Sequence, residues 1–245
     1  MQGYVRLMQA GLIILALAFS ARVFAVPVTY DGITFPDGDV SFADEVLDYD
    51  PSYSDEAGPT DPNYVDPAEA LGAPDYTGSV GSVSLGSGGL IELAFTDNSL
   101  TNSGDDAYDL HIFEIGPDVE DTFVAIRPTL DTFDLLGSSY DINGDGFFEI
   151  GSVNGSTSSL DIDAIFSGFT AGSLLFDAVQ LIDDPDKDGQ GGSTVGADID
   201  AVGAIYSAPP EPDKPPVASV PEPGTISLLS LGLLALGLVR RRTSG

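Results

Sequence analysis

The sequence predicts an all-β protein, a β-sandwich or jelly roll, and two observations carry that prediction. Short runs rich in β-branched and aromatic residues alternate with Gly, Asn, Asp and Ser along most of the chain. No helical periodicity separates these runs, and 29 glycines and 17 prolines indicate many turns. Hydrophobic residues make up 42% of the 245 residues, which is enough apolar material for a packed core.

The expected strands follow one another with little between them except turns. In order they are 28–35, 79–85, 90–96, 108–115, 122–128, 133–136, 147–153, 160–165, 173–182 and 198–206. One helical turn is expected after Asp66, which can cap it, with Pro67 at its first position, Glu69 at the capping-box position and Gly72 at its end. The acidic, proline-rich segment before this turn, 48–67, is expected to be a long loop.

Residues 1–25 have the pattern of a secretory signal peptide. Arg6 supplies the positive start, residues 10–19 form a short apolar run, and small residues precede a cleavage site expected after Ala25. The alternative is a retained membrane anchor, but the apolar run is shorter than the ~20 residues that a spanning helix needs. We therefore expect export of a mature domain that begins at residue 26.

The C-terminal end has a second apolar run, 225–239, followed by Arg240, Arg241 and Arg242. It predicts a short transmembrane helix whose arginine end stays in the cytoplasm. Its length suits a transient stop better than a permanent anchor, which remains the alternative. Proline-rich residues 207–219 are expected to link this tail to an acidic β-sandwich domain of residues 26–206.

The tail resembles the PEP-CTERM sorting signal of Gram-negative bacteria. The resemblance rests on Pro221, Glu222 and Pro223, then the apolar run, then the arginine cluster, all within residues 220–245. It implies that an exosortase processes the tail after transient anchoring in the inner membrane. It also implies a final location at the cell surface or in the extracellular matrix, where such proteins are associated with exopolysaccharide and biofilm.

Four stretches carry a second resemblance, to a domain of bacterial cell-surface proteins related to galactose-binding-like, discoidin-type jelly rolls. They are EALGAPD (69–75), VSLGSGGLIELAFTD (83–97), YDLHIFEIG (108–116) and GADIDAVGAI (196–205). This resemblance implies a fold and a location. It supplies no ligand and no catalytic residues.

Charge and composition exclude several classes of function. The formal net charge is −31, and all 39 acidic residues lie within residues 26–239, where only Arg127, Lys187 and Lys214 are basic. So negative a surface repels nucleic acid and attracts cations. Cysteine is absent, which rules out disulfides and thiolate metal sites.

Two acidic loops have the spacing of calcium ligands. In DINGDGFFE, Asp141, Asn143, Asp145 and Glu149 alternate as in a calcium loop, with a glycine at the sharp turn. In DPDKDGQGG the second set of candidate ligands is Asp184, Asp186 and Asp188. Neither loop has a closing carboxylate at its twelfth position, and Asn-Gly and Asp-Gly pairs also make ordinary turns, so both interpretations stay open.

The remaining candidates are weaker. Glu114 shares a strand face with apolar neighbours, while Asp198 and Asp200 are expected to share one strand face as a cation site or a solvated surface. The only histidine, His111, is expected to pack in a strand, and no nucleophile elbow, Walker loop or dinucleotide fingerprint occurs. Four tyrosines of the long loop are candidate sugar platforms: 49, 53, 64 and 76.

The sequence therefore predicts a non-enzymatic surface module, stabilised by calcium and binding a glycan or another matrix component. A secreted polysaccharide hydrolase and a passive structural matrix protein are the alternatives. A pair of carboxylates suffices for glycoside hydrolysis, so composition alone does not decide between them.

Overall fold

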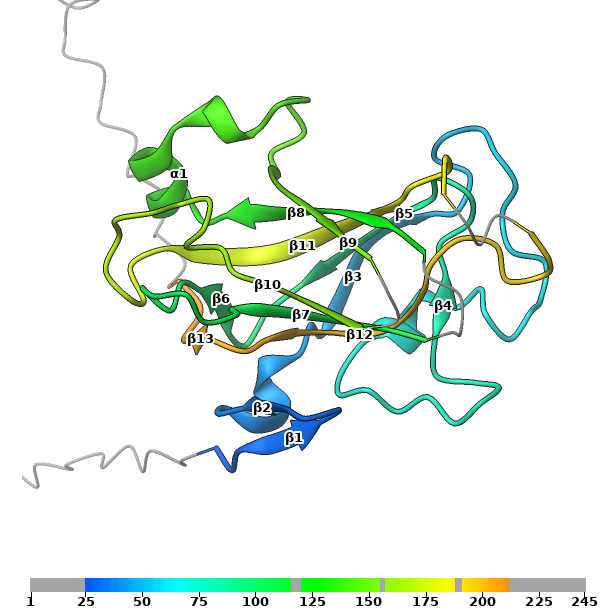
Figure 1. Cartoon of the computed structure of the whole chain (residues 1–245), viewed down its shortest axis with the longest axis horizontal. Coiled ribbons are helices and arrows are strands. Elements are labelled where there is room, and N and C mark those ends of the chain that lie inside the picture. The colour runs from blue at the N-terminus through cyan, green and yellow to red at the C-terminus, as the bar shows by residue number, and fades with distance from the viewer. Residues whose placement is uncertain (1–24, 116–119, 155–156, 188–190, 212–245) are drawn as a thin grey trace, which may run out of the picture.

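The computed structural model describes residues 25–115, 120–154, 157–187 and 191–211, and Figure 1 shows their arrangement. Two β-sheets lie one above the other, and a small two-stranded hairpin lies outside the lower sheet. The described part of the chain is predominantly β, as expected, with one short α-helix and three 3-10 turns. This arrangement is compatible with a β-sandwich.

The larger sheet has seven strands arranged around β11 (Leu175–Asp183). β11 pairs antiparallel with β5 (Leu90–Ala94) and β6 (Ser99–Thr101) along one edge and with β8 (Thr122–Pro128) along the other. The remaining strands extend the sheet outward: β3 (Glu45–Asp50) next to β5, β13 (Ser207–Ala208) next to β6, and β9 (Phe148–Val153) next to β8.

The smaller sheet has four antiparallel strands in the order β10, β7, β12, β4. Their bounds are Thr157–Leu160, Leu110–Glu114, Asp198–Ala204 and Val83–Ser84. β7 and β12 are the central pair, and both are buried along their whole length apart from the half-buried Asp198. Strands buried on both faces require cover on the outside of this sheet as well as between the sheets.

The main core lies between the two sheets and is built by period-two alternation. Leu110 and Ile112 of β7 point into it from the smaller sheet, while Val179 and Leu181 of β11 do so from the larger one. The next residues on β7, His111 and Phe113, therefore face outward.

The outer face of the smaller sheet is covered by the N-terminal hairpin of β1 (Val28–Tyr30) and β2 (Ile33–Phe35). A second apolar cluster forms there, in which the rings of Phe35, Phe42 and Phe113 pack together with centroids 4.7–6.1 Å apart. The hairpin thus buries the side of β7 that the main core leaves uncovered.

The helical elements are short. They are η1 (Gly38–Ser41), η2 (Pro67–Ala70), α1 (Leu130–Leu136) and η3 (Ser138–Tyr140). η2 is the predicted helical turn, and the Asp66 side chain accepts the Ala68 N–H at 3.1 Å as a cap should.

Several elements differ from the expectation. The strand expected at 133–136 is the second half of α1: Phe133 stacks at 5.9 Å on Phe148, and Gly137, at φ +75°, ends the helix. The run 28–35 is a hairpin rather than one strand, because Asp31 and Gly32 both adopt positive φ.

Other differences concern strand edges. The strand expected at 160–165 lies earlier, at β10, and the chain turns directly after it. β3 and β6 were not expected, because both are short edge or near-edge strands with polar residues. β13 forms from the first two residues of the segment expected to be a linker, so the pairing extends past residue 206.

The expected signal peptide lies outside the described residues except for Ala25, and the apolar tail 225–239 lies outside them entirely. Within the described ranges, none of the helices has both the length and the apolar character required for a membrane span.

Candidate functional site

A groove of about 400 Å³ lies on the outer face of the larger sheet, over β8, β9 and β11. Phe123, which is 48% exposed, and Ile182 supply its apolar surface. Asn143, Glu149 and Gln180 supply its polar groups. A mostly apolar groove with a few convergent polar groups is the usual form of a small-ligand site.

One wall of this groove is the loop 141–147, which is held against the sheet by an aromatic anchor. Phe147 packs among Ala94, Ala125 and Ala178, whose short side chains leave room for its ring. The Arg127 guanidinium lies 5.8 Å from the centre of that ring and donates to Asp177 at 2.6 Å. The loop is therefore positioned by packing as well as by its own turns.

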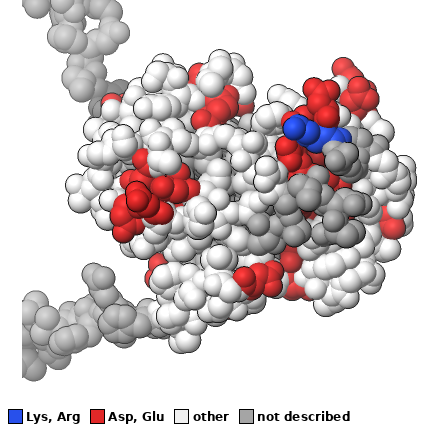
Figure 2. Space-filling model, viewed as in Figure 1, with Lys and Arg blue, Asp and Glu red and all other residues white. Residues whose placement is uncertain are grey.

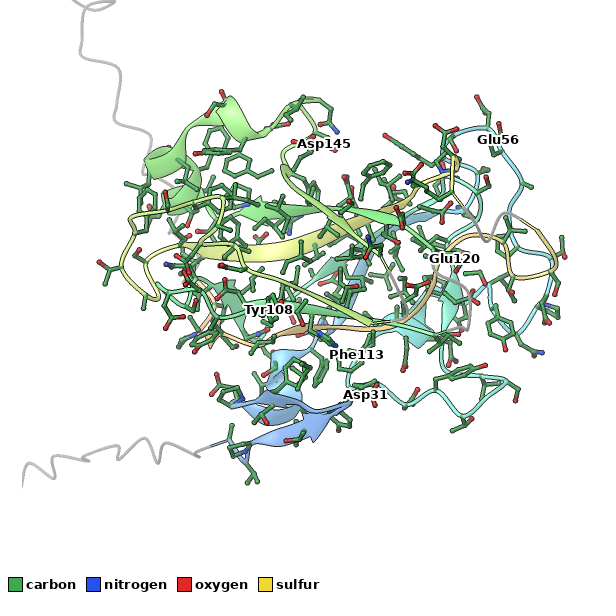
Figure 3. The ribbon with its side chains drawn as sticks, in the orientation of Figure 1. Asp31, Glu56, Tyr108, Phe113, Glu120 and Asp145 are labelled. Atoms are coloured by element: carbon green, nitrogen blue, oxygen red, sulfur yellow. The ribbon has the colours of Figure 1, made fainter. Side chains whose placement is uncertain are left out.

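Hydrogen bonds attach the same loop to β11. Gln180 Nε2 donates to Asp145 Oδ2 at 3.0 Å and to Glu92 Oε1 at 2.9 Å. Figure 3 shows Asp145 on this outer side of the larger sheet, well away from Glu120. The Gln180 amide thus ties the floor of the groove to its wall.

The structure gives the predicted calcium ligands of this loop clear backbone roles. The Asp141 carboxylate accepts the N–H groups of Gly144 and Gly146, at 2.7 and 3.1 Å. Glu149 Oε2 accepts the Ile142 N–H at 2.9 Å, and Asn143 Oδ1 accepts that of Asp145 at 3.0 Å. The candidate ligands are therefore brought into one compact turn.

The second predicted loop is only partly described. Asp184 Oδ1 accepts the Asp186 N–H at 3.1 Å, and Lys187 Nζ lies 3.4 Å from Asp121 Oδ2. Asp188 lies outside the described residues.

An acidic pocket of about 290 Å³ at another place was not foreseen. Carboxylate oxygens of Asp109, Asp161 and Asp163 approach within 4.8 Å of one another. This group could not be predicted from the sequence, because about fifty residues separate Asp109 from Asp161 and Asp163. Figure 2 shows separate acidic patches on the visible face, consistent with such gatherings of carboxylates.

These three carboxylates hold loops together. Asp109 is fully buried and accepts N–H groups from Ser103 and Ile162, both at 2.8 Å. Burial raises the pKa of Asp109 to about 6, although these hydrogen bonds oppose the shift. Asp163 accepts the Gly104 N–H at 2.7 Å and the Ser103 hydroxyl at 3.1 Å. The hydrogen bonds of Asp109 and Asp163 to the backbone explain why these carboxylates lie close together, so their arrangement is no evidence of a bound ligand.

The candidate tyrosines of the long loop have different environments. The Tyr49 hydroxyl donates to the Ser84 carbonyl at 2.7 Å, and burial raises its pKa to about 12. The hydroxyls of Tyr64 and Tyr76 lie 3.4 Å apart. Tyr53 is 53% exposed and is the most open of the four.

Asp198 and Asp200 do not share partners, because a β-bulge interrupts β12 between Ile199 and Ala201. Asp198 accepts a hydrogen bond from the Ser84 hydroxyl, while Asp200 accepts the Asp75 N–H at 3.0 Å. Burial raises the pKa of each to about 6.

The C-terminal tail matches a known protein-family model. Residues 219–242 match the model described as the PEP-CTERM protein-sorting motif. The match includes Pro221, Glu222, Pro223 and the three arginines on which the sequence prediction rests. The tail is a PEP-CTERM sorting motif. No curated protein and no solved structure matches the chain.

The PEP-CTERM motif implies processing by an exosortase and sorting towards the cell envelope or surface. The groove therefore belongs to a protein with an export address, and the ligands to consider for it are those found outside the cytoplasm.

Proposed function

We propose that this protein is an exported, non-enzymatic surface module whose galactose-binding-like β-sandwich binds a glycan of the extracellular matrix. The PEP-CTERM motif supports the location, and the groove over β8, β9 and β11 supports the activity. The observation that carries the proposal is the half-exposed Phe123 beside three side chains able to hydrogen-bond hydroxyl groups.

Sugar rings present apolar C–H faces and polar edges, so they bind aromatic surfaces flanked by amides and carboxylates. Phe123 offers the aromatic surface, Asn143 offers an amide and Glu149 offers a carboxylate acceptor. Gln180 offers its amide oxygen, because its Nε2 already donates to Glu92 and Asp145. Phe123 is exposed to solvent, so a sugar ring can reach it.

Binding is favoured over hydrolysis by the lining of the groove. Glycoside hydrolysis ordinarily uses two carboxyl groups facing each other across the bond that breaks. Among the described residues that line the groove, Glu149 alone carries a carboxylate.

The experiment is a glycan-array measurement on the purified full chain, followed by affinity measurement on the best-bound oligosaccharide. Phe123→Ala should weaken binding roughly two- to tenfold, because the loss of one aromatic contact is worth on the order of 0.5–1.5 kcal/mol. The matched control is Tyr108→Ala, an aromatic residue that is 56% exposed at a different place (Figure 3). Equal affinity in the Phe123→Ala variant and the parent chain contradicts the proposed site.

If no glycan on the array is bound and the protein is abundant in isolated matrix, the result supports the passive structural alternative instead. Turnover of a polysaccharide by the full chain, lost on changing Glu149→Gln, identifies the hydrolase alternative.

We further propose that calcium stabilises the wall of this groove at Asp141, Asn143, Asp145 and Glu149. The compact turn and the oxygen-only ligand set support this assignment. Calcium should then strengthen glycan binding, and Asp145→Asn should reduce that gain. Identical glycan affinity with calcium and with chelator argues against it.

A further inference from the structure

One end of the main core contains buried carboxyl groups from both sheets. Glu114 is the last residue of β7 in the smaller sheet, and Glu120 precedes β8 of the larger one. Their side chains are only 5% and 7% exposed, and they are hydrogen-bonded to each other. The side chains of two glutamates are therefore in contact where almost no solvent reaches them.

Strand alternation aims the cluster inward. Glu114 follows Leu110 and Ile112 on the core-facing side of β7, while Thr122 precedes Val124 on the core-facing side of β8. Asp183 faces Thr122 across the β11–β8 ladder and is fully buried. Its carboxylate accepts the Gly88 N–H at 2.9 Å and the Ala197 N–H at 3.0 Å.

Two oxygen atoms at this end have no partner although they are buried. Glu114 Oε1 and Thr122 Oγ1 lack any hydrogen bond within the described part of the chain, and both side chains are more than nine-tenths buried. An unpaired buried oxygen costs on the order of 1–3 kcal/mol, so two at one place require a reason.

The electrostatic environment of the two glutamates also favours a bound cation. Desolvation is the largest cause that raises the pKa of Glu114 to about 8 and of Glu120 to about 9, and the charges of Asp183 and Asp198 raise both further. The basic side chains of the described residues are engaged nearby or elsewhere: Lys187 with Asp121 at the rim and Arg127 with Asp177. Within the described part of the chain, neither Arg127 nor Lys187 is paired with Glu114 or Glu120.

We propose that this end of the core binds one calcium ion through the carboxylates of Glu114 and Glu120, with Thr122 Oγ1 as a further oxygen ligand and water completing the shell. Calcium takes six to eight oxygen ligands in flexible geometry, and carboxylate and hydroxyl oxygens are what this place offers. The absence of sulfur and imidazole from the cluster disfavours zinc and copper. The ion would join β7 of one sheet to β8 of the other.

This site is separate from the calcium proposed at the groove wall. Figure 3 shows Glu120 well separated from Asp145, which lies on the outer side of the larger sheet. Variants at one site can therefore be read independently of the other.

The test is calorimetric titration of calcium into the metal-stripped full chain, purified in detergent, with magnesium as the comparison ion. Glu114→Gln and Glu120→Gln should each remove one equivalent of bound calcium or weaken it at least about tenfold, since ligand charge sets affinity. Glu45→Gln, an exposed glutamate on β3, is the matched control and should bind as the parent does. Asp145→Asn should leave this equivalent intact.

Terbium luminescence on the unmutated chain covers the case in which the glutamine variants fail to fold. A terbium ion at this buried site should retain fewer bound waters than one in an exposed loop. Unchanged calcium stoichiometry and affinity in both glutamine variants would falsify the proposal. A second result would also contradict the proposal: the parent binds no calcium, and both glutamine variants are more stable than the parent in chelator. The two glutamates would then only share a proton.

Discussion

Gly203 of β12 is the point at which the N-terminal hairpin approaches the sheet most closely. A Cβ atom built there would lie 2.5 Å from Phe35 Cε1 and 2.9 Å from Phe42 Cε1. Both rings are buried in the second apolar cluster and have little room to retreat. The side-chain hydrogen of glycine is therefore what allows the hairpin to cover β7 and β12.

Gly203→Ala should lower the free energy of unfolding by about 1–3 kcal/mol, because it overpacks this contact. Gly191→Ala is the control, since a Cβ there meets nothing within 4 Å and its backbone is not in the left-handed region. Urea denaturation of both variants measures the difference. Equal stabilities would mean that the rings shift without cost.

His111 links stability to pH in a predictable direction. Its ring is 2% exposed, Nδ1 lies 2.5 Å from Ser159 Oγ, and Nε2 has no partner among the described residues. Burial lowers its pKa from 6.5 to about 4, while Asp31 opposes the shift. The unfolded state then binds a proton between pH 6.5 and 4 that the folded state does not, so this residue destabilises the fold as pH falls through that window.

Between pH 7 and pH 5 the parent chain should lose about 2 kcal/mol more stability than His111→Gln. Comparing the two proteins cancels the opposing contribution of buried carboxyls, which is common to both. Denaturation curves at the two pH values supply the measurement. Parallel pH profiles for the two proteins would show that His111 takes up its proton in the folded state.

Among the elements, the loop 141–147 shows how a long-range contact decides local structure. The sequence indicated a turn with calcium-like spacing, but it did not indicate that Phe147 would pack on three alanines of β5, β8 and β11. That contact depends on which strands are neighbours. The groove was unforeseen for the same reason, because Phe123, Glu149 and Gln180 meet only through strand pairing.

Phe147→Ala should reduce stability by about 3 kcal/mol through the cavity that it leaves, and it should also free the groove wall. Hydrogen exchange of residues 141–149 should accelerate more than that of β7, which lies in the other sheet. Phe133→Ala is a suitable comparison, since Phe133 is 36% exposed and lies on α1. Unchanged exchange in the loop would show that Asp141 and Gln180 hold it without the aromatic anchor.

Most core strands were predictable because their alternation or apolar runs are strong, as in 90–96, 122–128 and 173–182. The misses have identifiable causes. At 133–136 four residues with Phe and Leu suit either structure. The contacts that hold α1, Phe133 on Phe148 and Thr132 Oγ1 accepting the Leu175 N–H, come from distant segments. At β12 the side chains of Asp198 and Asp200 were expected on one face, but a β-bulge separates them. The spacing of the two residues in the sequence does not indicate this bulge.

The buried carboxyls at the end of the core could not be predicted as a group. Glu114, Glu120, Asp183 and Asp198 come from segments far apart in sequence, and the topology alone brings them together. The sequence singled out Glu114 from its apolar face, and it singled out Asp198 as a partner of Asp200 rather than of Glu114.

At the scale of the whole molecule, the charge of −31 should make stability depend on ionic strength. Figure 2 shows acidic groups in several patches with little basic surface between them. The described residues include two cations, Arg127 and Lys187, and each already faces an aspartate. Mutual repulsion among the remaining carboxylates therefore opposes the compact state.

Raising sodium chloride from about 0.01 M to about 0.5 M shortens the screening length from about 30 Å to a few ångström, which removes most of this repulsion. With chelator present throughout, so that no specific metal binding contributes, the melting temperature of the full chain should rise by several degrees. A gain of 1 kcal/mol corresponds to about 2–4 °C for a domain of this size. Most of the rise should occur below about 0.2 M and should be the same for different monovalent anions, because screening depends on ionic strength alone. The prediction is contradicted if the melting temperature does not change with salt, or if it changes with the kind of anion rather than with ionic strength. Repulsion between the acidic patches would then contribute little to the free energy of folding.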